Sequence, residues 1–290
     1  MSPKEIVDAM ETRLGVTGQP RQLRDAIEIE LLQIEKLPQA TAADLSDRVL
    51  HKVAAEIKAR AAAKADAGDW AVLDVRGKPD TSVHGASYVF GDDSPAIQSL
   101  KKTRALSEDL RKAIVALDFS DFEKFGAKVL GEIGTKISRY TRHAGDQGID
   151  FYGDITIGHA VGADPATQRL LHETRLVIVG QAKHYPNRVI GPAIVRELVG
   201  ALALSQTATF SSDIDLLDGV ELKPFTPVLA MLFTTGDFTR GARVLAKRAG
   251  LVTFSGTQLS VFLADRKVGM VDSGGQLIFN SAEFTGWLHS

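Results

Sequence analysis

The sequence predicts an α/β protein with a mixed sheet, preceded by a mainly helical N-terminal region. Two observations carry this prediction. Apolar runs typical of buried strands, at 175–183 and 228–235, alternate with amphipathic segments in the second half. The first part of the chain instead has apolar residues at helical spacing, as in QLRDAIEIELLQIEKL (22–37). The chain has 290 residues, enough for one large domain or two.

The N-terminal region, 1–110, is expected to hold helices followed by a hairpin. Thr41-Ala42-Ala43-Asp44 resembles a capping box and predicts the start of a second helix. Residues 70–75 and 86–90 then read as the two strands of a hairpin. Helices with a hairpin fit a winged-helix-like DNA-binding module, and they fit a helical dimerisation or scaffold domain equally well.

The second region, 111–290, is expected to alternate helices and strands. The segment 118–134 predicts an amphipathic helix that ends at Gly134, with Ser120 and Glu123 as a capping box. Strands are expected at 149–157, 175–183 and 228–235, with a short final strand from Leu251. Helices are expected at 193–206, after Pro192, and at 239–250. Residues 207–226 read as an acidic loop. The order α-β-β-α-β-α-β indicates an α/β sandwich with a mixed sheet.

Composition narrows the classes of function. Cysteine is absent, which excludes disulfides and thiolate metal sites and fits a reducing compartment. The N-terminus shows no apolar signal segment, and no apolar stretch approaches the roughly 20 residues that span a bilayer. We therefore expect a cytoplasmic protein without a membrane partner. No P-loop, no H-E-x-x-H zinc motif and no nucleophile elbow occurs.

One strand ends in residues with chemical potential. Gln181 and Lys183 close the apolar run 175–183, and their spacing of two places both side chains on one face. Asp150 follows a Gly-rich turn and begins the preceding strand. Where the two strands are neighbours, a carboxylate, an amide oxygen and a lysine meet. The oxygens suit Mg²⁺, and the lysine suits the negative charge that develops on a phosphate under attack. The alternative is a turn aspartate beside a solvated strand end.

These residues also carry a resemblance to a known family. FEKFGAKVLGEIG, AGDQGIDFYGD, VIVGQAKHY and MLFTTGDFTRGARVLAKRAG, in this order over about 115–270, resemble the catalytic domain of Mrr-type restriction endonucleases. This family is a branch of the PD-(D/E)xK nucleases in which Gln replaces the acidic residue of the second motif. The resemblance implies a restriction-endonuclease-like αβββαβ core, metal-dependent hydrolysis of DNA, and restriction of or defence against foreign or modified DNA.

The resemblance assigns roles to individual residues. Asp150 matches the metal-binding aspartate, Gln181 the substituted position and Lys183 the motif lysine, while Glu123 matches an acidic residue on the first helix. We expect Glu123, Asp150, Gln181 and the carbonyl of Ala182 to hold Mg²⁺, with Mn²⁺ as a substitute. Asp146 also matches an acidic family position, and we interpret it as a turn residue. Basic residues around the metal loop are expected to contact DNA: Arg139, Arg142, His143, His184 and Arg188.

Partners follow from this chemistry. The expected substrate is double-stranded DNA, and cutting both strands favours a homodimer. Two other readings stay open: a non-catalytic nucleic-acid-binding protein that retains the nuclease fold, and a nuclease that acts on RNA or single strands.

Overall fold

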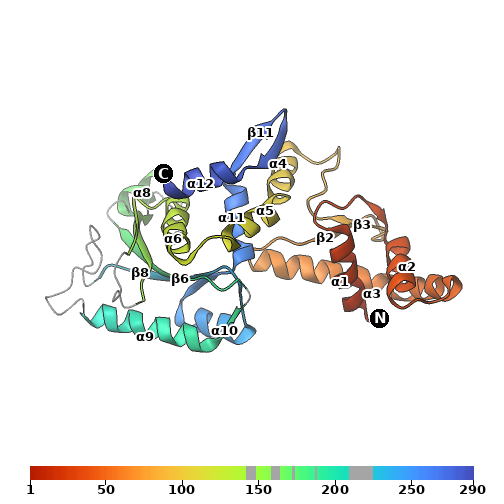
Figure 1. Cartoon of the computed structure of the whole chain (residues 1–290), viewed down its shortest axis with the longest axis horizontal. Helices are drawn as coiled ribbons and strands as arrows, with labels where there is room; N and C mark the ends of the chain where they lie inside the picture. The colour runs from red at the N-terminus through yellow and green to blue at the C-terminus, as the bar shows by residue number, and fades with distance from the viewer. Residues whose placement is uncertain (142–147, 158–163, 172–173, 187, 209–224) are drawn as a thin grey trace. The chain divides into compact units, whose positions relative to one another are not determined.

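The structure of this chain, a computed structural model, describes residues 1–141, 148–157, 164–171, 174–186, 188–208 and 225–290. These residues divide into two compact units (Figure 1). The first contains Met1–Ser107 and the short segment Asp272–Leu277. The second contains Glu108–Val271 and Ile278–Ser290. Most of the expected acidic loop at 207–226 lies outside the described residues.

The first unit combines helices with a small antiparallel sheet. Its elements in chain order are α1 (Pro3–Leu14), β1 (Arg21–Gln22), α2 (Leu23–Ile34), α3 (Gln39–Asp66), β2 (Leu73–Arg76), β3 (Ser82–Gly85) and α4 (Pro95–Arg104). The sheet order is β1-β3-β2, with β3 antiparallel to both neighbours. Ile6, Ile27, Val53 and Val83 belong to one buried core, which joins the helices to the sheet. The mainly helical N-terminal region is confirmed.

Two local expectations for this unit are wrong. Helix α3 already begins at Gln39 after Pro38, so Thr41 lies inside the helix and does not cap it. The second strand of the hairpin is Ser82–Gly85, earlier than 86–90. After β3 the chain turns, since the Tyr88 N–H donates to the Gly85 carbonyl at 2.8 Å. The rings of Tyr88 and Phe90 then pack on one another, which explains why these β-formers lie outside the sheet.

The second unit is built on a mixed five-stranded sheet in the order β10-β8-β6-β5-β4. Its strands are β4 (Ile137–Tyr140), β5 (Phe151–Thr156), β6 (Arg175–Lys183), β8 (Val228–Thr234) and β10 (Val252–Phe254). Strand β6 pairs antiparallel with β5 and parallel with β8. The main helices are α6 (Phe119–Ile133) and α9 (Pro192–Ala208). The order α6-β4-β5-β6-α9-β8 confirms the expected αβββαβ core.

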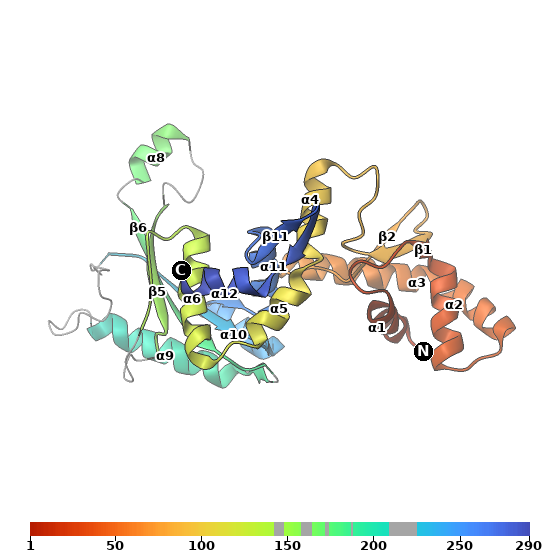
Figure 2. The same ribbon diagram turned by 45° about the horizontal axis from the view of Figure 1, so that its top comes forward.

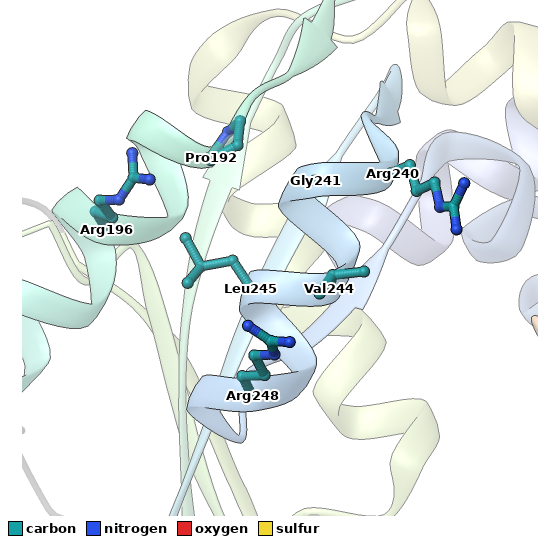
Figure 3. Close-up of a pocket in the computed structure, with 7 residues that line it drawn as sticks. All are labelled: Pro192, Arg196, Arg240, Gly241, Val244, Leu245 and Arg248. Atoms are coloured by element: carbon teal, nitrogen blue, oxygen red, sulfur yellow. The ribbon is translucent and has the colours of Figure 1, made fainter.

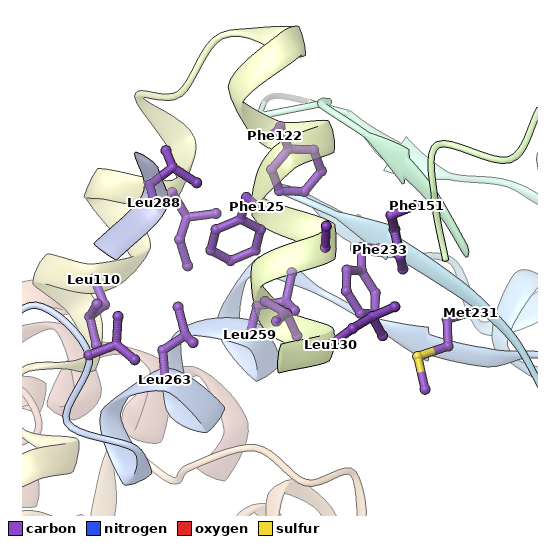
Figure 4. Packing of buried hydrophobic residues seen from close by; sticks show 14 of the residues in the cluster. Leu110, Phe122, Phe125, Leu130, Phe151, Met231, Phe233, Leu259, Leu263 and Leu288 are labelled. Atoms are coloured by element: carbon purple, nitrogen blue, oxygen red, sulfur yellow. The ribbon is translucent and has the colours of Figure 1, made fainter. Parts of the chain in front are cut away.

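Helices cover both faces of this sheet, as the mostly buried strands require. On one face α6, α11 (Gly256–Asp265) and α12 (Ser281–His289) pack around Phe151 and Phe233 (Figure 4). On the other face α9 and α10 (Arg240–Ala249) pack against Leu232 and Phe238. Figure 1 shows α9 and α10 together on the side of β6 and β8 opposite α6. The sheet is therefore the middle layer of the unit.

Helix α6, which carries Glu123, has well-defined ends. Its N-cap is Asp118, whose side chain accepts a hydrogen bond from the Asp121 N–H at 2.7 Å. The expected capping box at Ser120 is wrong, because the helix already begins at Phe119 and the Asp118 carboxylate caps it. The helix ends at Gly134 in the left-handed region (φ 103°), as its position predicts.

The remaining described elements connect these layers. They are α5 (Ser107–Val115), α8 (Pro165–Leu171), β7 (Val189–Ile190), β9 (Asp237–Phe238), β11 (Met270–Ser273) and β12 (Gln276–Phe279). Figure 2 shows α8 beyond the ends of β5 and β6 where Thr156 pairs with Arg175. That end of the sheet is opposite to the one where β6 finishes at Lys183. Among the described helices, none has the length and apolarity to cross a membrane.

Candidate active site at the end of strand β6

The last residues of β6 lie in the middle of the sheet. Gln181 pairs with Leu232 and Lys183 with Thr234 on the parallel neighbour β8. Gln181 is only 5% exposed, and Lys183 is half-buried. Neighbouring residues in register share a face, so both side chains project towards the face that α9 and α10 cover. The reading of Gln181 as part of a solvated strand end is therefore excluded.

Asp150 is held against this end of β6 by two hydrogen bonds. Its backbone N–H donates to the Gly180 carbonyl at 2.8 Å. Its carboxylate Oδ2 accepts from the backbone N–H of Ala182 at 2.7 Å. The N–H and C=O of one strand residue point to the same side, so the Ala182 carbonyl also faces Asp150. Asp150 therefore lies beside residues 180–182 of β6, which include Gln181.

Phe151 anchors the neighbouring aspartate. Its ring occupies space left by two glycines, Gly126 on α6 and Gly180 on β6. A Cβ atom at Gly126 would lie 2.3 Å from the ring, and one at Gly180 only 2.1 Å from it. The Phe151 ring, directly after Asp150, therefore packs β5 closely against both α6 and β6. Sequence reasoning missed this role, although an isolated glycine inside an apolar strand is a signal for close approach.

The side-chain oxygen of Gln181 has no partner among the residues that the structure describes. Its Oε1 is buried, and no hydrogen-bond partner for it exists in the described part of the chain. Its Nε2 lies near the turn before Asp150, since a Cβ atom at Gly148 would be 3.0 Å from it. A buried, unpaired amide oxygen is costly unless a ligand or water completes it. An oxygen-seeking cation between Gln181 and Asp150 meets that requirement.

The donor set fits a hard divalent cation better than a softer metal. In the residues that the structure describes, no three His, Cys, Asp or Glu side chains gather as a metal site. A cation here would instead take one or two carboxylates together with an amide oxygen and a backbone carbonyl. Mg²⁺ accepts such a set, because it binds few protein oxygens and keeps several waters.

Glu123 lies on the part of α6 that reaches the end of β6. It is half-buried, and the ring of the preceding Phe122 contacts the ring of His184 with 5.7 Å between centroids. The adjacent Lys124 is engaged with Asp121 at 2.8 Å, a hydrogen bond that raises the pKa of Lys124. The first turns of α6 are therefore beside the residue that follows Lys183. Whether Glu123 shares a cation with Asp150 stays a prediction.

The residues expected to contact DNA occupy different positions. Arg139 is exposed on β4, opposite Tyr152, and Arg188 is exposed with its guanidinium 6.0 Å from the Tyr185 ring. His184 is half-buried, with Nε2 3.2 Å from the Val115 carbonyl oxygen. Arg142, His143 and Asp146 lie outside the described residues. DNA contact by these side chains stays a prediction.

One buried charge was not anticipated from the sequence. Asp154, on β5, is 2% exposed and accepts two hydrogen bonds from Arg175 on β6, at 3.0 and 2.6 Å. The pair lies at the far end of these strands from Asp150, as their register shows. This carboxylate is thus a structural element of the β5–β6 pair and not a further residue of the candidate site.

A family model agrees with this architecture. Residues 114–219 match the family model Mrr_cat, described as a restriction endonuclease, which confirms the resemblance over that segment. The solved structure of the MspJI restriction endonuclease in complex with a 27-mer oligonucleotide aligns with 62% of this chain and 35% of its own, at 21% identity and a TM-score of 0.36. The restriction endonuclease FokI bound to DNA aligns with 91% of this chain and 44% of its own, at 10% identity and a TM-score of 0.37.

The chain spans less than half the length of either of these two structures. No curated protein matches the chain in sequence.

Proposed function

We propose that this chain, whose residues 114–219 match the restriction endonuclease model, is a metal-dependent DNA endonuclease. The observation that carries the proposal is the hydrogen bond between Asp150 and the Ala182 N–H. It places the candidate metal-binding carboxylate beside the strand that presents Gln181 and Lys183. A carboxylate, an amide oxygen without a partner in the described part of the chain and an ammonium at one end of a sheet support the proposal, because hydrolysis of a phosphodiester needs groups of these kinds.

The residues that would hold the cation are Glu123, Asp150, Gln181 and the carbonyl of Ala182. A bound Mg²⁺ supplies charge neutralisation at the phosphate and a more acidic water. Asp150 is already oriented by Ala182, so its carboxylate needs little reorganisation to bind a ligand. Gln181 contributes an oxygen that would otherwise remain buried and unpaired in the described structure.

Lys183 would act on the phosphate and the attacking water. Its ammonium projects to the same face as Gln181, and the neighbouring Thr234 is fully buried. Partial burial strengthens the attraction between the ammonium and a phosphate that gains negative charge. Lys183 therefore stabilises the developing charge and orients water by donating hydrogen bonds.

The first unit would bind or select DNA. Its order α1-β1-α2-α3-β2-β3, with the antiparallel sheet β1-β3-β2, supports a winged-helix-like module with the β2–β3 turn as the wing. We infer that this unit raises DNA affinity and that the second unit performs the chemistry. Cleavage of both strands of a duplex, in restriction or defence, would engage a homodimer.

The experiment is cleavage of methylated and unmethylated plasmid by the purified chain with Mg²⁺, Mn²⁺ or EDTA. We expect nicked or linear product with either metal and none with EDTA. Single-stranded DNA and RNA are parallel substrates. Binding of duplex without cleavage under any metal would support a non-catalytic protein instead, and preferential cleavage of RNA or single strands would replace the duplex proposal.

A further inference from the structure

A groove of about 460 Å³ lies between α9 and α10 in the second unit (Figure 3). Its rim carries three arginines, Arg196 from α9 and Arg240 and Arg248 from α10. Its floor is apolar and consists of Pro192, Gly241, Val244 and Leu245. Val244 is 45% exposed, so this part of the floor is accessible to solvent.

The groove follows from how the two helices begin. Strands β7 and β9 pair in parallel just before them, and the Thr239 N–H donates to the Ile190 carbonyl at 2.9 Å. The first turns of α9 and α10 therefore lie side by side. Gly241 permits this contact, since a Cβ atom there would lie 3.3 Å from Pro192 Cγ. Both helices thus direct their positive N-terminal ends to the same end of the groove.

The three arginines differ from their basic neighbours on α10. All three are exposed, and none forms an ion pair with a carboxylate in the described part of the chain. Arg243 is instead bound to Asp237. Lys247 is exposed and does not line the groove. Among the residues that the structure describes, the groove therefore gathers positive charge that no carboxylate neutralises.

The position of the groove relates it to the candidate active site. Strands β6 and β8 run parallel and end at Lys183 and Thr234, shortly before α9 and α10 begin. The helix N-termini are consequently at the same end of the sheet as Lys183. They also cover the face towards which Gln181 and Lys183 project, because Leu232 packs in the same cluster as Val195 and Ala242.

We propose that this groove binds the sugar–phosphate backbone of a DNA duplex, beyond the phosphate that is cleaved. The inference rests on the proposed function and adds a second contact region to it. Arginines on the rim donate to phosphate oxygens, and the apolar floor packs against deoxyribose. Arg240 and Arg248 are separated by about 12 Å along an α-helix, so each meets a different phosphate. Contacts of this kind position the duplex without reading its sequence.

The test is the affinity of the full chain for a DNA duplex in EDTA, measured by fluorescence anisotropy from about 50 to 200 mM salt. We expect Arg196→Ala, Arg240→Ala and Arg248→Ala each to weaken Kd by roughly three- to tenfold. Each should also reduce the slope of log Kd against log salt by about one. The triple variant should lose about two to three units of slope. Arg248→Lys, which keeps the charge, should lose less affinity than Arg248→Ala.

The matched control is Lys247→Ala, which removes one positive charge from the same helix outside the groove. We expect it to change Kd less than twofold. Equal losses for Lys247→Ala and Arg248→Ala would indicate a general effect of net charge and overturn the proposal, as would an unchanged triple variant. Because EDTA prevents metal-dependent cleavage, these binding results are independent of catalysis. A chain that binds through the groove but cleaves nothing would refute the proposed function alone.

Discussion

Asp150, directly before β5, and Ala182 on β6 are joined by a hydrogen bond of 2.7 Å, which the backbone N–H of Ala182 donates to the carboxylate Oδ2 of Asp150. This hydrogen bond fixes the orientation of the Asp150 carboxylate at the end of β6. Strand β6 thereby ends beside the candidate metal-binding aspartate.

Asp150→Asn should separate metal binding from structure. The amide oxygen can still accept from the Ala182 N–H, so we expect a Tm close to that of the wild type. Cleavage should be lost, because the charge that attracts a cation is gone. Asp150→Ala removes the acceptor as well and should cost about 1 kcal/mol more in unfolding free energy. Cleavage assays and thermal melts of both variants test these expectations. Cleavage by Asp150→Asn at the rate of the wild type would contradict the metal-binding role.

Lys183→Ala should reduce cleavage by roughly 100- to 1,000-fold, the range for removing one group that stabilises charge in a transition state. The side chain is only half-buried, so its truncation should change Tm little. Duplex binding in Ca²⁺ should fall much less than cleavage. The three quantities are measured side by side for wild type and variant. Unchanged cleavage at unchanged stability would mean that the lysine has no catalytic part.

Gln181→Glu should strengthen cation binding. The side chain is 5% exposed with its Oε1 unpaired in the described structure, so a carboxylate of the same shape adds charge where a cation would bind. Without metal we expect a lower Tm than wild type, because a buried carboxylate lies near Asp150. Added Ca²⁺ should raise the Tm of this variant at a concentration about tenfold lower than the concentration that raises the Tm of the wild type. Gln181→Leu is the control, and added Ca²⁺ should not raise its Tm.

Gly180→Ala should disturb the anchoring of Asp150. The new Cβ would lie 2.1 Å from the Phe151 ring, and overpacking of a core costs about 1–3 kcal/mol. We expect a lower Tm and weaker cleavage, because the residue next to Phe151 is Asp150. Gly200→Ala on α9 is the matched control, since nothing lies within 4 Å of its Cβ position. A Gly180→Ala variant as stable as Gly200→Ala would refute the contact between the two strands and this ring.

Arg175→Ala should destabilise the second unit by about 3 kcal/mol, because it leaves the carboxylate of Asp154 buried without the guanidinium group that pairs with it. Adding Asp154→Asn should recover part of the loss. Arg111→Ala is the comparison, as Arg111 bonds Glu108 through two nitrogens at 2.9 Å but on the surface. It should cost less than about 1 kcal/mol. Chemical denaturation of the variants measures the differences, and equal effects would mean that burial of Asp154 does not matter.

The sequence by itself predicted the helices α6, α9 and α10 and the strands β5, β6, β8 and β10 in their order, but it did not predict β4 or the elements after β10. The apolar run 175–183 became β6 with the same bounds, and Thr239 and Gly250 cap α10 where their positions predict. These features depend on local chemistry: side-chain period, free helix N–H groups and the left-handed freedom of glycine. The N-terminal strand boundaries were less accurate, because Tyr88 and Phe90 favour a strand by propensity but pack on each other after a turn.

Only the tertiary structure decided which residues meet. The spacing of Gln181 and Lys183 predicts a shared face, but no local pattern says that β5 lies beside β6 and gives the carboxylate of Asp150 to the N–H of Ala182. The Phe151 ring between Gly126 and Gly180, the buried pair of Asp154 with Arg175, and the groove between α9 and α10 likewise join segments far apart in the chain. Pairing of strands and packing of helices are long-range choices set by the whole core, and a single sequence records them only indirectly.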